Sequence, residues 1–238
     1  MKMTLKYEIT DIQHPDKPKL FRIRALRDIP RFKVKAGDLG GYVKNTGNLN
    51  QRGDCWIGGD ACVYGTAQVS IDAYVYGNAQ VYGKARVLGD TRVFDNAQVF
   101  HDARVYSKAR VYENAQVYGN AYLSNYVRIF GNAQIYGEAS AYSNSHIFGN
   151  ARVYSHAKIY GSARVYGDAK VSGSATIDGN VAINENMKVL GESYINSSSQ
   201  IYYSDGVTAY FDKFEKLLVN GTRKHKTHHE TLARLKLL

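Results

Sequence analysis

The chain has 238 residues, a formal net charge of +10 at pH 7 and 44% hydrophobic residues, which fits one large folded domain or two small ones. Its only cysteines are Cys55 and Cys62, so a disulfide framework and a zinc site built from cysteines are excluded and a reducing compartment is favoured. The sequence shows no leader-like N-terminus and no run of about 18 apolar residues. We therefore expect a cytoplasmic protein, in a bacterial host cell if phage-encoded, and assign it no membrane contact.

The positive charge is concentrated at the two ends of the chain. Residues 1–54 hold 12 Lys+Arg against 6 Asp+Glu, residues 55–206 hold 12 against 12, and residues 207–238 hold 7 against 3. A protein that follows phosphates along its length needs a basic excess on its long element. Nucleic-acid binding through basic ends is therefore the weakest of the functions considered.

The N-terminal segment predicts a small β cap. Residues 6–10 and 20–29 are predicted as two strands, joined as a hairpin around a loop at residues 13–18. Gly37, Gly40 and Gly41 predict a sharp bend. Val43 and Leu49 then begin a coil that is two residues out of phase with the repeat that follows. We assign residues 1–54 to this cap and its first coil.

From Ile57 to Ile201 an apolar residue recurs every six positions. Only Ala141, of the 25 positions in that register, is not Val, Ile or Leu, and a small residue usually follows four positions later. The unit V-Y-G-N-A-Q predicts a short strand and a turn. Ala and Val point inward, Gln and Tyr point outward, and Gly-Asn turns the corner.

Three such units close one triangular coil of 18 residues. The repeat over residues 55–206 thus predicts an all-β fold, a left-handed parallel β-helix of about eight coils that is roughly 40 Å long at about 4.8 Å per coil. A period of six excludes an amphipathic α-helix, whose period is about 3.6, and solenoids with periods of about five or nine.

The C-terminal segment predicts a second, basic cap over residues 207–238. Residues 207–219 hold two strand-like stretches, and residues 228–238 fit a short helix with Leu232, Leu235 and Leu238 on one stripe. His225, His228 and His229 lie in this basic tail, where we favour a solvated cluster over a metal site. Both caps would cover the open backbone edges of the stack.

The hexads resemble the left-handed β-helix superfamily, which includes trimeric acyl- and acetyltransferases that use acyl-carrier protein or acetyl-CoA. The segments LFRIRALR (residues 20–27), KAGDLGGYV (35–43) and GDCWI (53–57) resemble the N-terminal part of hexapeptide-repeat proteins found in bacteriophages and prophages. Those proteins carry transferase-like or polymer-forming names, and a shared fold does not establish activity.

The superfamily's enzymes usually have a loop that interrupts the coils and a histidine that activates the acceptor hydroxyl. Here nothing interrupts the hexads, His101 and His156 fall at corners, and His146 falls at an outward strand position. No family motif surrounds these histidines. We therefore assign no catalytic residue, no metal and no cofactor, and keep an acyl- or acetyltransferase with a site between subunits as the alternative function.

Outward residues 18 positions apart are expected to form ladders along the rod. The candidate binding face combines aromatic and basic residues: Tyr76, Arg92, Phe94, Arg110, Tyr112, Arg128, Phe130, His146, Phe148, Arg164 and Tyr166. A second face carries Tyr64, Tyr82, Phe100, Tyr118, Tyr136 and Tyr154 beside Gln80, Gln98, Gln116 and Gln134. A third is patchier, with Leu88, Tyr106, Ser124, Tyr142, Tyr160 and Asp178.

These ladders have two explanations. Contiguous Tyr and Arg can anchor an interface, whereas stacked rings can also serve only the sheet, at about 0.2–1 kcal/mol per neighbouring pair. The leading hypothesis is a non-enzymatic binding or scaffold protein, derived from a phage or prophage, that presents its aromatic and arginine face to a protein partner or to another copy in a homo-oligomer.

Overall fold

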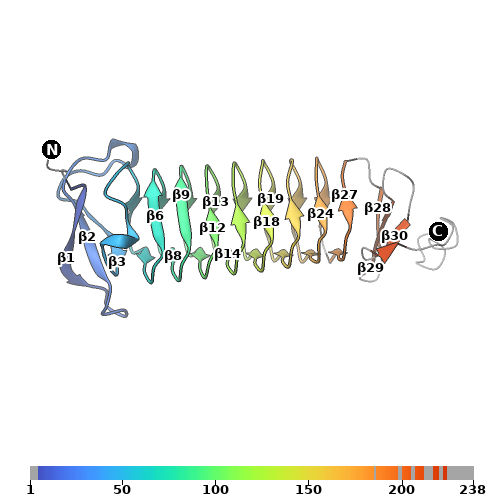
Figure 1. Ribbon diagram of the computed structural model, residues 1–238, viewed down its shortest axis with the longest axis horizontal. Coiled ribbons are helices and arrows are strands. Elements are labelled where there is room, and N and C mark those ends of the chain that lie inside the picture. Colours follow the sequence, from blue (N-terminus) through green and yellow to red (C-terminus); the bar gives the residue numbers. More distant parts are fainter. Residues whose placement is uncertain are drawn as a thin grey trace.

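The computed structural model describes residues 5–184 and 186–197, together with the backbone of four strands between residues 200 and 223. These residues form a parallel β-helix of about eight coils with a β cap at its N-terminal end (Figure 1). The fold is almost entirely β, as predicted. The proposed helix at residues 228–238 and the three tail histidines lie outside the described residues.

Each coil contributes one strand to each of three parallel sheets, which we name after their outward residues. The arginine sheet contains β4 (Trp56–Ile57), β7 (Tyr74–Val75), β10 (Arg92–Val93), β13 (Arg110–Val111), β16 (Arg128–Ile129), β19 (His146–Ile147), β22 (Arg164–Val165) and β25 (Ala182–Ile183). The glutamine sheet contains β5 (Cys62–Val63), β8 (Gln80–Val81), β11 (Gln98–Val99), β14 (Gln116–Val117), β17 (Gln134–Ile135), β20 (Arg152–Val153), β23 (Lys170–Val171) and β26 (Lys188–Val189). The mixed sheet contains β6 (Gln68–Ile71), β9 (Arg86–Gly89), β12 (Arg104–Val105), β15 (Tyr122–Leu123), β18 (Ser140–Ala141), β21 (Lys158–Ile159), β24 (Thr176–Ile177) and β27 (Tyr194–Ile195).

Strand pairing confirms the period of 18 residues. Val93 pairs with Val111 in the arginine sheet, and Val99 pairs with Val117 in the glutamine sheet, in both cases in parallel. The Tyr112 N–H donates to the Ile129 carbonyl of the next coil at 3.0 Å. Each six-residue unit is therefore one side of a triangular coil.

The core is a narrow column of small and β-branched side chains. The two inward positions of each unit are fully buried, as Val111 and Ala115 illustrate. Ala141, the one lapse in the apolar register, is buried as well. Burying a valine stabilises the fold by about 1.5–3 kcal/mol, and the column repeats this gain along the whole rod.

Each corner contains one residue in the left-handed backbone region. Glycine often holds it, as at Gly77 with φ +70°, where a Cβ would lie 3.0 Å from the Asp95 backbone nitrogen of the next coil. Polar residues take the same conformation at Asp95 and His101. Ile71 also does so, with φ +65°, a strained conformation for a β-branched residue.

A ladder of asparagines runs along the corner that follows the arginine sheet. Asn78 donates from its amide to Asn96, which donates to Asn114, at 3.2 Å in both cases. The chain of bonds continues through Asn132 to Asn150. Each amide thus satisfies the next, as in stacked parallel strands, which explains why Asn recurs beside the corner residue.

The predicted N-terminal hairpin is confirmed. Strand β1 (Tyr7–Gln13) pairs antiparallel with β2 (Phe21–Ala25), which pairs antiparallel with β3 (Leu39–Val43). Two short 3-10 helices, η1 (Pro30–Phe32) and η2 (Thr46–Asn48), complete the cap. Strand β3 joins the glutamine sheet with Val43 opposite Val63, so the predicted offset of two residues is also present.

Two glycines predicted to form a bend lie instead within a strand. Gly37 does turn the chain, with φ +94°, but Gly40 and Gly41 are buried in β3. A Cβ on Gly41 would collide with the Ala61 carbonyl, and one on Gly40 with the Ile57 carbonyl. Glycine is required there because the cap lies directly against the first coil.

The last predicted hexad does not continue the parallel stack. Strand β28 (Gln200–Ser204), which contains Ile201, pairs antiparallel with β29 (Val207–Phe211). This sheet continues through β30 (Leu217–Val219) and β31 (Thr222–Arg223). Apolar spacing alone cannot reveal the change, because residue 201 keeps the period while its pairing partner differs.

The inward register predicts that Val111→Asp is far more damaging than Tyr112→Ser. Val111 lies between Val93 and Ile129 with no exposed surface, so a buried unpaired carboxylate there costs several kcal/mol. Loss of the neighbouring ring removes two stacking contacts, about 0.5–1.5 kcal/mol each. Thermal unfolding of both variants measures the difference, and a lower melting temperature for Tyr112→Ser would show the register to be wrong.

Candidate functional site

The aromatic ladder of the arginine sheet is a continuous stack of rings. Neighbouring ring centroids lie 4.8–5.0 Å apart and neighbouring planes lie within 7° of parallel, through Tyr76, Phe94, Tyr112, Phe130, Phe148 and Tyr166. This spacing matches the separation of strands in a sheet. Each ring is partly buried between its neighbours, so ring edges, rather than ring faces, are exposed along the ladder.

The stack extends further toward the N-terminus than the sequence indicates. Tyr74 lies 4.4 Å from Tyr76, and Phe32 lies 4.3 Å from Tyr74, centroid to centroid. Tyr74 occupies the strand position that holds arginine in later coils. The aromatic residue two positions before Tyr76 was a visible signal for this extension, but Phe32 comes from the non-repeating cap and had none.

Beside this stack runs a ladder of basic side chains. Arg92 pairs in register with Arg110, which pairs with Arg128, and the series continues through His146 to Arg164. Like charges that face each other across neighbouring strands are destabilising. Within the described part of the chain, the ion pairs of the protein involve none of these four arginines.

The nearest acidic corner residues do not neutralise these arginines. Asp95 and Glu113 lie at the corner next to the aromatic stack, and both carboxylates accept backbone hydrogen bonds from the following coil. The Glu113 N–H donates to Asp95 at 3.2 Å, and the Gly131 N–H donates to Glu113 at 2.8 Å. The outward strand positions from β10 to β22 hold no carboxylate, so this side of the rod is cationic.

The pKa of His146 is lowered from its ordinary value by burial and, secondarily, by the positive charges of Arg128 and Arg164. The neutral imidazole is therefore favoured. The direction of this shift agrees with an arginine ladder whose charge is not compensated locally.

The second aromatic ladder has the same geometry and a different polar neighbourhood. Its ring centroids lie 4.8–5.1 Å apart from Tyr64 to Tyr154. The Tyr82 hydroxyl donates to the Gln98 carbonyl oxygen at 3.3 Å. On the mixed sheet, Tyr142 and Tyr160 stack at 5.1 Å, but the ladder is broken elsewhere. The predicted inequality of the three faces is therefore present.

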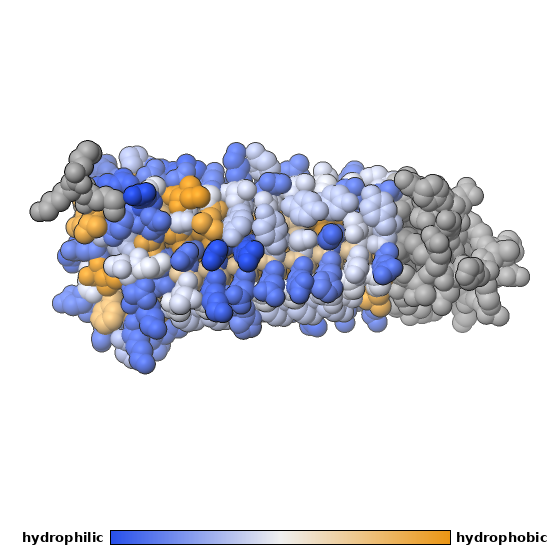
Figure 2. Space-filling view, viewed as in Figure 1, coloured by the Kyte–Doolittle hydropathy of each residue, from blue (hydrophilic) through white to orange (hydrophobic). Residues whose placement is uncertain are grey.

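Figure 2 shows hydrophilic residues in rows along one side of the rod and hydrophobic residues gathered toward the N-terminal cap. Exposed apolar residues of the cap include Leu5, Ile12, Leu26 and Leu39. The described residues contain no cluster of three or more side chains able to hold a metal ion. They also contain no helix long and apolar enough to cross a membrane.

The three rod histidines lie where the repeat places them. His101 and His156 are at corners, and His146 is on β19. His156 lies 3.2 Å from the Glu138 carboxylate, and the His101 ring makes an edge contact with Phe100. The structure brings none of the three together.

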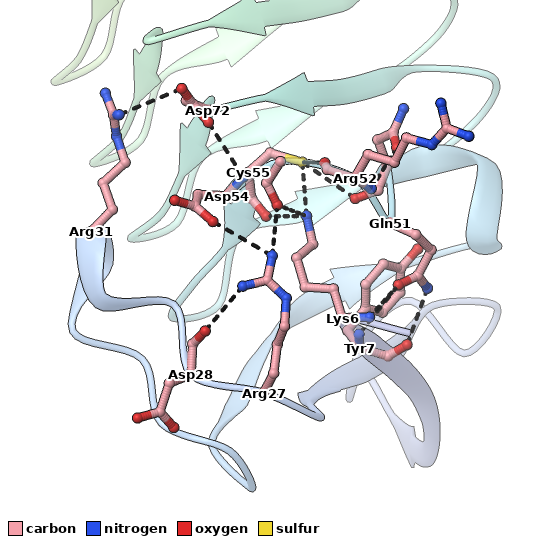
Figure 3. A network of polar contacts seen from close by, with 12 residues as sticks. Lys6, Tyr7, Arg27, Asp28, Arg31, Gln51, Arg52, Asp54, Cys55 and Asp72 are labelled. Atoms are coloured by element: carbon pink, nitrogen blue, oxygen red, sulfur yellow. Dashed lines mark hydrogen bonds and ion pairs between the residues drawn. The ribbon is translucent and has the colours of Figure 1, made fainter. Parts of the chain in front are cut away.

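A polar network in the cap was not expected from the sequence. Lys6 is fully buried, and its ammonium donates to the Cys55 carbonyl at 2.8 Å and to the Cys55 sulfur at 3.0 Å (Figure 3). Burial lowers the pKa of Lys6, and the neighbouring Cys55 opposes this shift. The Tyr7 hydroxyl donates to the Leu49 carbonyl at 2.7 Å. These bonds fix β1 onto the first coil.

Comparison with known proteins gives no relative. The chain matches no known family, and no curated protein is similar enough to match it. Function must therefore be argued from the geometry of the rod and its cap.

Removing the neighbouring charges should raise the pKa of His146. Arg128→Gln with Arg164→Gln removes the two cations that lower it, whereas burial, the larger cause, stays. The upward shift is measured by NMR titration of the imidazole protons. Arg86→Gln, on the mixed sheet, is the matched control and should leave the titration unchanged. An unchanged His146 titration in the double variant would show that the arginine ladder does not act on this side chain.

The buried tyrosine of the cap predicts a loss of stability in alkali. Burial raises the pKa of Tyr7 from 10.0 to about 12, so between these values the unfolded chain loses a proton that the folded chain keeps, and stability falls as pH rises. Tyr7→Phe should cost about 1–2 kcal/mol at pH 7 through an unsatisfied carbonyl and show a shallower decline above pH 10. Urea unfolding from pH 7 to 12 tests this, and parallel curves for the two proteins would contradict it.

Proposed function

We propose that this protein is a non-enzymatic binding or scaffold protein whose arginine and aromatic face docks an acidic protein partner. The observation that supports this function most is the in-register ladder of four arginines without ion pairs in the described residues. A carboxylate-rich partner would relieve the repulsion within the ladder and would be steered to it electrostatically.

The aromatic stack supports the same class of partner. Aromatic edges carry positive partial charge, and edges are what the stack exposes beside the arginines. Tyr and Arg are also the residues that most often anchor interfaces. The rigid rod holds both ladders in place before binding, so little side-chain ordering is required.

Self-association through this face is the less favourable form of the proposal. In an isologous dimer the same surface meets itself, and arginine would face arginine. A second copy could contribute acidic corner residues only through a different surface. We therefore place the partner outside this chain and treat self-association as an outcome of the test.

Two other functions receive less support. Single-stranded nucleic acid binds by stacking bases on free aromatic faces, and most faces in the two long ladders are covered by neighbouring rings. An acyltransferase of the hexapeptide-repeat superfamily usually shapes its site with an inserted loop, and no insertion interrupts the coils between β4 and β27. The six-residue period and the cap segments motivate our assignment to phage-type hexapeptide-repeat proteins.

The test compares two matched triple variants. One combines Arg110→Ser, Tyr112→Ser and Arg128→Ser on the arginine sheet, and the other combines Gln116→Ser, Tyr118→Ser and Gln134→Ser on the glutamine sheet. Binding to poly-L-glutamate is measured by calorimetry at two salt concentrations. We expect the first variant to lose at least about tenfold in affinity, which is about 1.4 kcal/mol, and the second to bind as the parent does.

Melting temperature and molar mass in solution complete the comparison. Both variants lose one ring from equivalent stacks, so similar melting temperatures are expected and would separate binding from folding. Equal loss of binding by both variants would show that the arginine face is not the docking surface. A parent protein that forms oligomers dispersed only by the first variant would instead assign the face to self-association.

A further inference from the structure

The two aromatic ladders end differently at the N-terminal side of the rod. On the arginine sheet, Tyr74 and Phe32 close the end of the stack. On the glutamine sheet the stack begins at Tyr64, one face of which is covered by Tyr82 at 5.0 Å and 3°. Val43 pairs with Val63, so the next rung toward the cap is held by Lys44. No ring of the chain completes this second stack.

A groove of about 480 Å³ lies at this open end. It is lined mainly by apolar surface, between the loop that follows β1 and the first coil, and its lining residues are Lys17, Pro18, Lys19, Leu20, Lys44, Tyr64 and Gly65. Leu20 is buried with Tyr42 and Cys62, and Tyr64 packs against this cluster. The floor of the groove is therefore fixed by the core of the cap. Its volume falls within the range of about 300–1,000 Å³ that is usual for small-molecule sites.

Three lysines surround the groove without a carboxylate partner. Within the part of the chain that the structure describes, the ion pairs include neither Lys17 nor Lys19 nor Lys44. The Lys17 ammonium lies 5.3 Å from the Tyr64 ring centroid and donates to the Gln80 side-chain oxygen at 2.9 Å.

The acidic residue nearest in the fold is already engaged. Asp60, at the corner before Cys62, forms an ion pair with Arg22 at 2.7 Å. The positive charge around the groove is therefore available to a ligand rather than used in the fold.

We propose that this groove binds a small anion with a flat aromatic body and phosphate groups, of the nucleoside-phosphate class. The base would continue the stack at Tyr64, as Tyr74 and Phe32 continue the other ladder, and stacking on an aromatic side chain favours a base of any sequence. The lysines would hold the phosphates as mobile point charges. This site lies on the glutamine sheet and does not depend on the function proposed for the arginine face.

The experiment uses ATP as the probe and measures its binding to the full-length protein by calorimetry. Adenosine tests the aromatic body alone, and tripolyphosphate tests the charge alone. We expect saturable binding of ATP at one site, and at least about fivefold weaker binding for either fragment. Adenosine or tripolyphosphate that binds as tightly as ATP would overturn the proposal, as would a failure of ATP to bind.

Four variants assign the binding to the groove. Tyr64→Leu and Lys44→Gln should each weaken ATP binding by at least about threefold. The matched controls are Tyr118→Leu, from the middle of the same stack, and Lys84→Gln, from an exposed corner one coil away. Both controls should bind as the parent does, and equal losses in targets and controls would overturn the site.

Two further measurements keep the result independent of folding and of longer nucleic acids. Tyr64→Phe retains the ring and should retain binding, even if Tyr64→Leu lowers the melting temperature. Loss of binding in Tyr64→Phe would overturn the stacking role of this residue. A single-stranded oligonucleotide that binds while ATP does not would replace the small-ligand site with a nucleic-acid surface.

Discussion

Backbone hydrogen bonding between successive coils is the constraint on which the rest of this protein depends. Because the Tyr112 N–H bonds to Ile129 eighteen residues later, and every coil repeats that step, each side chain lies directly beside its counterparts above and below. The inward column, the corner asparagines, the ring stacks and the arginine ladder are consequences of this one step. The chain cannot choose the neighbour of an outward side chain independently of its period.

The same constraint explains why the rod was predictable and the cap was not. Inward Val and Ala, corner conformations and outward ladders follow from a local period, so residues such as Val111 and Tyr112 could be placed from the sequence. The burial of Lys6 against Cys55, the collision that requires Gly41 and the contact of Phe32 with Tyr74 depend on segments that do not repeat. The change of pairing at β28 was missed for a related reason, since Ile201 keeps the period.

Charge on the rod is separated by position, although its total over residues 55–206 is balanced. Many of the basic residues occupy strand positions that face solvent, whereas carboxylates such as Asp95 and Glu113 occupy corners and bind backbone N–H groups. A net charge therefore describes this protein poorly. The arginine face and the lysine groove are both surfaces on which local charge is left without a partner in the described structure.

The triangular coil also sets how the length of such a protein can change. Insertion or deletion of 18 residues would add or remove one coil and leave every ladder continuous. Deletion of only six residues would keep each inward residue inward, but it would turn all downstream ladders onto the neighbouring side of the rod, and arginines would follow glutamines. Variation in length is thereby restricted to whole coils wherever a continuous face matters, as a thread advances only by complete turns.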